Sequence, residues 1–252
     1  YALTGINQKL VDIKILYVEI DSSVYYNSSQ ISNIDSLKTN VTNALQSYSD
    51  SVDLSKFGGR FKYSKVLNVI DDVDRSITSN ITRVRVRRNL RALINQEAQY
   101  ELCFGNKFHV NPAGFNIKST GFKIINEPDI VYLTDIPNAD GMKGVLSIVK
   151  PIEETGENRV VIKSAGIVDY VKGEVILSTT LITETVVAND VIEIQAFPES
   201  NDVVGLKDLY LEFDVSKSTI NMVRDTISSG EKISGVGFKV TSSYSNGELK
   251  RG

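Results

Sequence analysis

The chain has few of the residues that build disulfides, metal centres or common catalytic triads. Its 252 residues include one cysteine, Cys103, and one histidine, His109. A single thiol cannot form an internal disulfide, and a reducing cytosol is compatible with such a chain. No zinc site of the usual kind can be built from one His and one Cys. A Ser-His-Asp triad would have to use His109, but no Gly-x-Ser-x-Gly turn accompanies it. We therefore interpret His109 as a loop or strand-end residue that makes hydrogen bonds.

Long apolar runs and targeting segments are also absent from the sequence. No run approaches the ~18 apolar residues that a membrane-spanning helix requires, and the start shows neither a signal nor a transit peptide. Because the sequence begins with Tyr1 and not with Met, we expect a trimmed or fragmentary chain. The formal net charge of −3 provides no global positive field for nucleic acid or anionic lipid. We expect neither kind of partner.

The N-terminal part predicts a strand and then a long helix. Residues from Val11 to Tyr26 are rich in β-branched and aromatic side chains, which favours a strand. Asn33 or Asp35 can cap the helix with a side-chain oxygen. Its apolar stripe recurs at spacings of three and four residues and consists of Ile34, Leu37, Val41, Ala44, Leu45 and Tyr48.

A shorter helix and a second strand complete the predicted N-terminal unit. Ser64 is a good cap for the helix, whose apolar positions are Val66, Leu67, Val69 and Ile70. Ile77 to Leu90 predicts a strand in which Val84 and Val86 point one way and the intervening arginines the other. Residues 1–92 thus predict a small α+β domain in the order strand, helix, helix, strand, with both helices on one sheet face.

Residues 93–252 predict a second, mostly antiparallel β-rich domain, so the fold class expected for the whole chain is α+β. Turn signals separate short strands, as expected for an antiparallel β domain. One late helix is predicted at Ser218–Ser228, with Ile220, Val223 and Ile227 on one face. The polar tail from Ser242 to Gly252 is expected to be flexible. The predicted strands are Tyr100–Phe108, Phe122–Ile125, Ile130–Leu133, Gly144–Val149, Val160–Lys163, Glu174–Ser178, Val191–Ala196 and Leu209–Val215.

Neither carboxylates nor glycines form a recognisable ligand motif. Asp71, Asp72 and Asp74 are the densest carboxylate cluster, and such clusters can hold a divalent cation. The EF-hand pattern fails, however, and Asp at the end of a helix commonly bonds the local backbone. No phosphate-binding glycine loop is present. We predict no catalytic, cofactor-binding or metal site.

Arginines in and around the second strand are the one charge concentration that suggests an interface. The set is Arg83, Arg85, Arg87, Arg88 and Arg91. Their planar guanidinium groups form forked pairs with carboxylates, so they suit a neighbouring subunit. The row could also grip phosphates, or form a solvated face that discourages edge-to-edge aggregation. We predict a protein interface, because the chain is acidic and no aromatic residues are interleaved with these arginines.

The order of elements over roughly residues 10–92 resembles the baseplate J-like family of contractile phage tails. The run from Phe57 to Leu90, with its arginine strand, more closely resembles the inner-ring wedge subunits of T-even-type phages. The resemblance is carried by the helix end Ala44-Leu45-Gln46-Ser47-Tyr48, the loop Lys56-Phe57-Gly58-Gly59, the helix Tyr63-Ser64-Lys65-Val66-Leu67-Asn68-Val69-Ile70 and the following turn Asp71-Asp72-Val73-Asp74.

This resemblance implies a structural role in a virion. Wedge subunits associate as dimers, join neighbouring wedges into a ring around the tail hub, and rearrange when the tail contracts. The implied partners are the chain itself and other wedge and hub proteins, with no small-molecule substrate. Assembly would take place in the host cytoplasm. No catalytic residues come with the resemblance, so a non-enzyme is expected.

Two other interpretations remain open. A tail-associated module that binds a receptor or carbohydrate would share the β-rich half, although the absence of Trp weakens this alternative because sugar sites usually stack on exposed aromatics. A hydrolase could use carboxylates such as Asp71 and Asp72 as acid and base. Carboxylates are too common in the sequence to select a pair.

Overall fold

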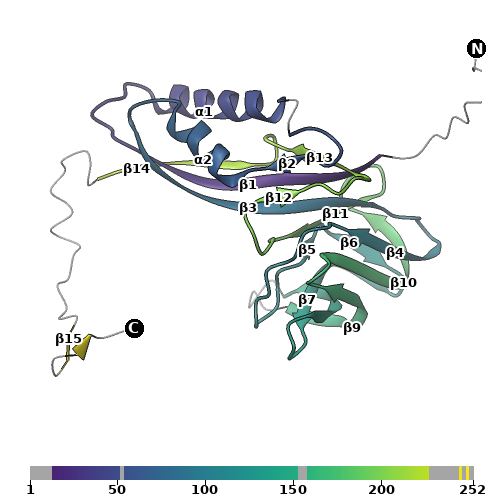
Figure 1. Cartoon of the computed structure of the whole chain (residues 1–252). Coiled ribbons are helices and arrows are strands. Elements are labelled where there is room, and N and C mark those ends of the chain that lie inside the picture. The colour runs from purple at the N-terminus through teal and green to yellow at the C-terminus, as the bar shows by residue number, and fades with distance from the viewer. Residues whose placement is uncertain (1–12, 52–53, 153–157, 227–243, 246–247, 250–252) are drawn as a thin grey trace, which may run out of the picture.

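The computed structural model describes residues 13–51, 54–152, 158–226, 244–245 and 248–249, and these are mostly β-strand (Figure 1). The elements are β1 (Lys14–Tyr26), α1 (Ile34–Ser49), β2 (Arg60–Phe61), α2 (Tyr63–Asp71), β3 (Ile77–Arg91), β4 (Glu97–Cys103), β5 (Lys118–Ser119), β6 (Phe122–Ile124), β7 (Glu127–Pro137), β8 (Lys143–Pro151), β9 (Asn158–Asp169), β10 (Glu174–Thr185), β11 (Val191–Ala196), β12 (Val203–Val204), β13 (Leu209–Phe213), β14 (Thr219–Arg224), β15 (Tyr244–Ser245) and β16 (Glu248–Leu249).

The larger helix forms where the apolar spacing predicts it. The Asn33 side chain caps α1 by accepting hydrogen bonds from the backbone N–H groups of Asp35 and Ser36. Leu37, Val41 and Leu45 are buried on the face that packs on the sheet. These observations confirm Asn33 as the cap and most of the predicted stripe, whereas Ile34 at its start is exposed.

The cap of the shorter helix differs from the prediction. Helix α2 begins at Tyr63, one residue before Ser64, and its N-cap residue Lys62 makes no side-chain capping bond. The Asp202 carboxylate instead accepts a hydrogen bond from the Tyr63 backbone N–H at 2.8 Å. A residue 139 positions away in the sequence therefore supplies the cap, and the prediction of Ser64 as the cap is wrong.

The first sheet has the order β13-β1-β3-β11-β5, and helices α1 and α2 lie together on one side of it (Figure 1). The long strands β1 and β3 pair in antiparallel fashion from Tyr17 opposite Arg87 to Tyr26 opposite Ile77. Strands β13 and β14 lie one after the other along the opposite edge of β1, and both run parallel to it.

The second sheet closes into a small barrel. Strands β6, β7, β8 and β9 pair in sequence, and β10 pairs with both β6 and β9. Strand β4 extends the sheet by pairing with residues 174–181 of β10, and β6 pairs with the residues of β10 that follow. Gly166 lies where β9 meets β10, and a Cβ at this position would collide with the carbonyl oxygen of Ile176.

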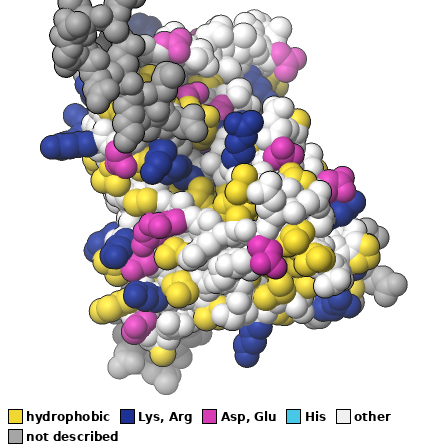
Figure 2. Space-filling view, turned by 90° about the vertical axis from the view of Figure 1, so that its right-hand side faces the viewer, with side chains coloured by type: hydrophobic (Ala, Val, Ile, Leu, Met, Phe, Trp, Pro, Cys, Tyr) yellow, Lys and Arg dark blue, Asp and Glu magenta, His cyan; other side chains and the backbone are white. Residues whose placement is uncertain are grey.

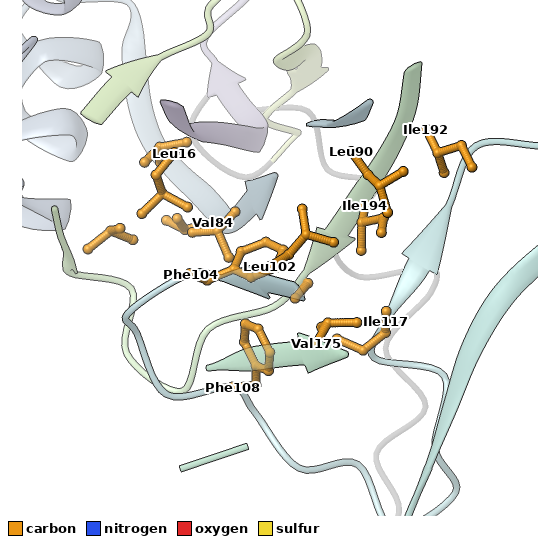
Figure 3. Close-up of a cluster of buried hydrophobic side chains, with 14 of the residues drawn as sticks. Leu16, Val84, Leu90, Leu102, Phe104, Phe108, Ile117, Val175, Ile192 and Ile194 are labelled. Atoms are coloured by element: carbon orange, nitrogen blue, oxygen red, sulfur yellow. The ribbon is translucent and has the colours of Figure 1, made fainter. Parts of the chain in front are cut away.

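One continuous hydrophobic core joins the first sheet to the barrel. Leu90 of β3 and Ile192 and Ile194 of β11 are buried in the same cluster as Leu102 of β4 and Val175 of β10 (Figure 3). Phe104 and Phe108 meet edge to face with ring centroids 5.1 Å apart. The junction between the sheet and the barrel is therefore apolar and closely packed.

The predicted fold class, α+β with one late helix, is wrong. The described residues contain two helices, α1 and α2, and the remaining elements are strands. The segment predicted as the late helix, Ser218–Ser228, contains strand β14, in which buried Ile220 lies between exposed Thr219 and Asn221. A short apolar pattern of this kind fits both the helical period and the strand period. The segment forms a strand because it pairs with the edge of β1.

The remaining predictions about organisation concern the domain boundary and the chain ends. The boundary at residue 92 stays a prediction, and the first sheet contains strands from both sides of it. Residues 11–12 of the first predicted strand, residues 227–228 of the predicted helix and residues 242–243, 246–247 and 250–252 of the polar tail lie outside the described residues. Neither of the described helices has the length and hydropathy needed to cross a membrane.

Candidate interaction surfaces

The arginines of β3 divide between the two faces of the first sheet. Arg83, Arg85 and Arg87 alternate with buried Val84 and Val86, as predicted from the sequence. The strand register then places each of them opposite a residue of β1: Arg83 faces Asp21, Arg85 faces Glu19 and Arg87 faces Tyr17. Opposite charges directly across an antiparallel pair stabilise the pairing. The pattern within β3 could not reveal this pairing, because the carboxylates lie in a different strand, β1.

Arg87 lies at the centre of a buried charge network. Its side chain is 3% exposed and donates from Nε to the Glu19 carboxylate at 2.5 Å and from Nη2 to the Asp214 carboxylate at 2.6 Å. Nη1 donates to the Asn89 side chain at 2.6 Å, and Glu193 lies 3.4 Å from the same nitrogen. A charge this deeply buried requires such partners, because their loss leaves it without solvation.

Side chains from β11 and β13 enclose this network. Gln195 donates from Nε2 to Glu19 at 2.8 Å, and Lys217 pairs with Glu193. The Tyr17 ring lies 4.1 Å from the Arg87 guanidinium carbon, in a cation–π contact. Burial raises the pKa of Glu212, and the nearby Asp214 carboxylate adds to the effect. The network therefore ties β1, β3, β11 and β13 together through side chains as well as through backbone bonds.

The other predicted interface arginines differ widely in exposure. Arg88 points to the opposite face, is 7% exposed, and donates from Nη1 to the Cys103 carbonyl oxygen at 2.5 Å. Burial lowers its pKa. Arg85 is partly exposed, and Arg83 and Arg91 are exposed. Within the predicted set, Arg83 and Arg91 are open to a partner and Arg85 is only partly so, because it also pairs with Glu19 at 4.0 Å. Arg87 and Arg88 are engaged within the chain. The interface role of the set stays a prediction.

A basic cavity that was not predicted from the sequence lies between the end of α1 and the start of α2. Its volume is about 460 Å³. Four of the residues that line it are cationic, namely Lys56, Arg60, Lys62 and Lys65, and none of its described lining residues is Asp or Glu. We call this site the basic cavity. All four cations lie within residues 56–65, a stretch that contains no Asp or Glu, so the sequence carries a local signal for them that the prediction did not use.

The carboxylate cluster of the sequence forms an exposed turn after α2. Asp71, Asp72 and Asp74 are all exposed, and we call residues 71–74 the acidic turn. Asp71 accepts a hydrogen bond from the Asn80 side chain at 2.7 Å, and the Ser76 backbone N–H lowers the pKa of Asp74. No group of three potential metal ligands occurs in the part of the chain that the structure describes. His109 is also exposed, and its backbone bonds to Phe197 and Asn116.

The barrel exposes many large apolar side chains. Figure 2 shows hydrophobic side chains scattered among charged ones on the face seen from the right of Figure 1. Apolar side chains scattered singly over a surface are normal, so they do not by themselves mark an interface. The large apolar residues exposed on barrel strands or beside them include Ile125, Ile130, Ile136, Ile152, Val160, Ile162 and Ile167.

Residues 14–89 match one protein-family model. Its description is baseplate structural protein gp6, C-terminal domain III. The matched segment runs from the start of β1 almost to the end of β3, so it contains α1, α2 and four of the five predicted interface arginines, and it covers less than a third of the chain. A comparison with curated proteins found no match.

The family match bears on several predictions made from the sequence. It supports a structural component of a phage baseplate, and therefore a virion tail protein that contacts other baseplate proteins. It also favours a non-enzymatic role. The matched family is the gp6 domain and not the baseplate J-like family, so the finer part of the resemblance is not supported.

Proposed function

We propose that this chain is a wedge subunit of a contractile phage baseplate, which joins neighbouring wedges into a ring around the tail hub through protein–protein contacts. The observation that carries the proposal is the match of residues 14–89 to a baseplate structural domain. The partners would be further copies of the chain and other wedge and hub proteins, and assembly would take place in the host cytoplasm.

The surface of the described residues supports this proposal. The barrel offers apolar side chains and the first sheet offers Arg83, Arg85 and Arg91, which is the mixture of apolar and arginine contacts that protein interfaces favour. Beneath these surfaces, the Arg87 network ties strands of the first sheet to one another. The shared core joins that sheet to the barrel. We therefore expect tail contraction to change contacts between subunits and to leave the internal packing of this chain intact.

Reconstitution with the neighbouring tail proteins of the same phage tests the proposal. The chain would be co-expressed with each of them and the complexes resolved by mass photometry. We expect a stable complex with at least one wedge or hub protein, and electron microscopy of the assembled baseplate should place the chain in the ring. A chain that binds none of these proteins, or a phage that builds complete baseplates without it, would contradict the proposal.

The exposed arginines provide a sharper version of this experiment. Reversing Arg83 and Arg91 to Glu should weaken binding to the baseplate partner by about tenfold or more, because exposed charges at an interface now repel. Lys38→Glu, an exposed substitution on helix α1, is the control and should bind like the unaltered chain. Equal binding by both variants would exclude these two arginines from the interface.

A further inference from the structure

Arg87 and Arg88 are neighbours on β3 and both are buried, but the described residues balance only one of the two charges. The carboxylates of Glu19 and Asp214 accept hydrogen bonds from Arg87. Arg88 is 7% exposed and makes one hydrogen bond, from Nη1 to the carbonyl oxygen of Cys103. Within the described part of the chain, no carboxylate oxygen lies within 4.0 Å of the Arg88 guanidinium group. Arg88 therefore carries a buried charge without a counter-charge.

A buried charge of this kind lowers the stability of the chain that contains it. One neutral carbonyl oxygen replaces little of the water that a guanidinium group loses on burial. In keeping with this, burial lowers the pKa of Arg88. An apolar residue of similar size is commonly neutral or stabilising at such a position. The presence of an arginine there indicates a role outside the stability of the isolated chain.

The Arg88 guanidinium group keeps donors that no described residue accepts. Nε is enclosed and has no hydrogen-bond partner. Nη2 has no partner either, and unlike Nε it is not fully enclosed, so it can be reached from outside the chain. Nε and Nη2 share one edge of the planar group, and a carboxylate can accept hydrogen bonds from both nitrogens of such an edge. The unused donors therefore match a carboxylate.

The surface beside Arg88 offers an apolar contact as well. A Cβ at Gly105, two residues after Cys103, would collide with the Leu206 side chain, so Leu206 lies close to the carbonyl that holds Arg88. Leu206 is itself exposed. The exposed Asp208 carboxylate follows in the same loop and acts on the Arg88 charge without forming an ion pair with it. An arginine bordered by apolar surface is a common composition of protein interfaces.

We propose that Arg88 binds a carboxylate side chain, Asp or Glu, of another baseplate protein, and that this contact completes the buried charge in the assembly. Because Arg88 is already desolvated in the free chain, the partner's carboxylate meets a cation that loses little further solvation on binding. This inference rests on the proposed function for the existence of such a partner. It selects one residue from the predicted arginine set and assigns the chemistry of the group that it meets.

Arg88→Met tests the inference in the complex with the baseplate partner. We expect about tenfold weaker binding or more, because the partner's carboxylate loses its counter-charge. The free variant should unfold at the same urea concentration as the unaltered chain or at a higher one, since no paired charge is lost. Asp208→Asn removes a charge from the neighbouring loop and is the control, which should not weaken binding.

A scan of the partner identifies the carboxylate that Arg88 meets. Surface Asp residues of the partner are changed to Asn and Glu residues to Gln, one at a time. One change should weaken binding to the unaltered chain about tenfold and leave binding to the Arg88→Met variant unaffected, because the two residues form one contact.

Three results would overturn the inference and leave the proposed function intact. They are normal binding by Arg88→Met, unfolding of that variant at a clearly lower urea concentration, and a partner scan in which no change depends on Arg88. The second result would show that Arg88 has its counter-charge within the chain. If no baseplate protein binds the unaltered chain, the inference and the proposed function fail together.

Discussion

At the scale of single residues, Arg87 shows how an arginine that looks like an interface residue becomes an internal one. The sequence placed it correctly on the polar face of β3, but not among Glu19, Asp214 and Glu193, which come from three other parts of the chain. Alternation along a strand follows from local geometry. The partners follow from the pairing of β1, β11 and β13 with or around β3, which no local pattern encodes. For the same reason, the sequence pattern could not distinguish exposed Arg83 from buried Arg87.

Replacing Arg87 should cost far more stability than replacing its exposed neighbour. Arg87→Met leaves buried carboxylates without their counter-charge and should lower the free energy of unfolding by about 3–5 kcal/mol. Arg83→Met should change it by at most about 0.5 kcal/mol, because Arg83 is exposed. Urea denaturation of both variants measures the difference. Adding Glu19→Gln to Arg87→Met should recover part of the loss, and a fully additive loss would argue against a coupled network.

Tyr170 makes a second buried polar contact, inside the barrel. Its hydroxyl donates to the Asp135 carboxylate at 2.5 Å, and both residues are buried. Burial raises the pKa of Tyr170 above its ordinary value of 10.0, and the bond to Asp135 adds to the shift. The stability that this raised pKa provides is present below pH 10 and is lost as the pH rises further, because the unfolded chain then releases the proton first.

The Tyr170→Phe variant isolates this contribution. At neutral pH it should be less stable by about 1–3 kcal/mol, because a buried carboxylate oxygen loses its donor. Above pH 10 the unaltered chain should lose stability more steeply than the variant, so the gap between the two should narrow. Chemical denaturation at a series of pH values measures the gap. A gap that is constant up to pH 11.5 would show that Tyr170 does not retain its proton in the folded chain.

At the scale of elements, sequence patterns predicted secondary structure correctly where local signals determine it. They predicted it wrongly where contact with a distant part of the chain determines it. Helix α1 follows from its apolar spacing and from Asn33. The segment of β14 was predicted as a helix because Ile220 and Val223 recur at three residues, but the edge of β1 makes it a strand. The cap of α2 comes from Asp202, which no pattern near Ser64 could reveal. The basic cavity was missed for a different reason, since its four cations lie close together in residues 56–65 and this local cluster was not weighed.

Removing this distant cap should loosen the start of α2. Asp202→Ala leaves the Tyr63 N–H group without its acceptor and should lower stability by about 1 kcal/mol. Amide hydrogen exchange should rise most in the first turn of α2 and little in α1. Asp202→Asn keeps an acceptor oxygen and should behave nearly like the unaltered chain. Equal exchange in the Ala and Asn variants would show that the bond does not support the helix.

At the scale of the whole molecule, the junction between the first sheet and the barrel decides how the chain unfolds. Residues from β3, β4, β10 and β11 share one buried cluster there, and Phe104 is fully buried within it (Figure 3). A shared apolar core of this kind couples the two parts, so calorimetry should show one cooperative transition whose calorimetric and van 't Hoff enthalpies agree.

Phe104→Ala should break this coupling. The lost packing costs about 3–5 kcal/mol, and because the cavity lies in the junction, the single transition should split into one for the barrel and one for the helix-covered sheet. Phe61→Ala removes an equally buried ring from the contact with Phe213, away from the barrel, and should lower the transition temperature without splitting it. If both variants instead unfold in one transition, the sheet and barrel are bound together by more than the junction around Phe104.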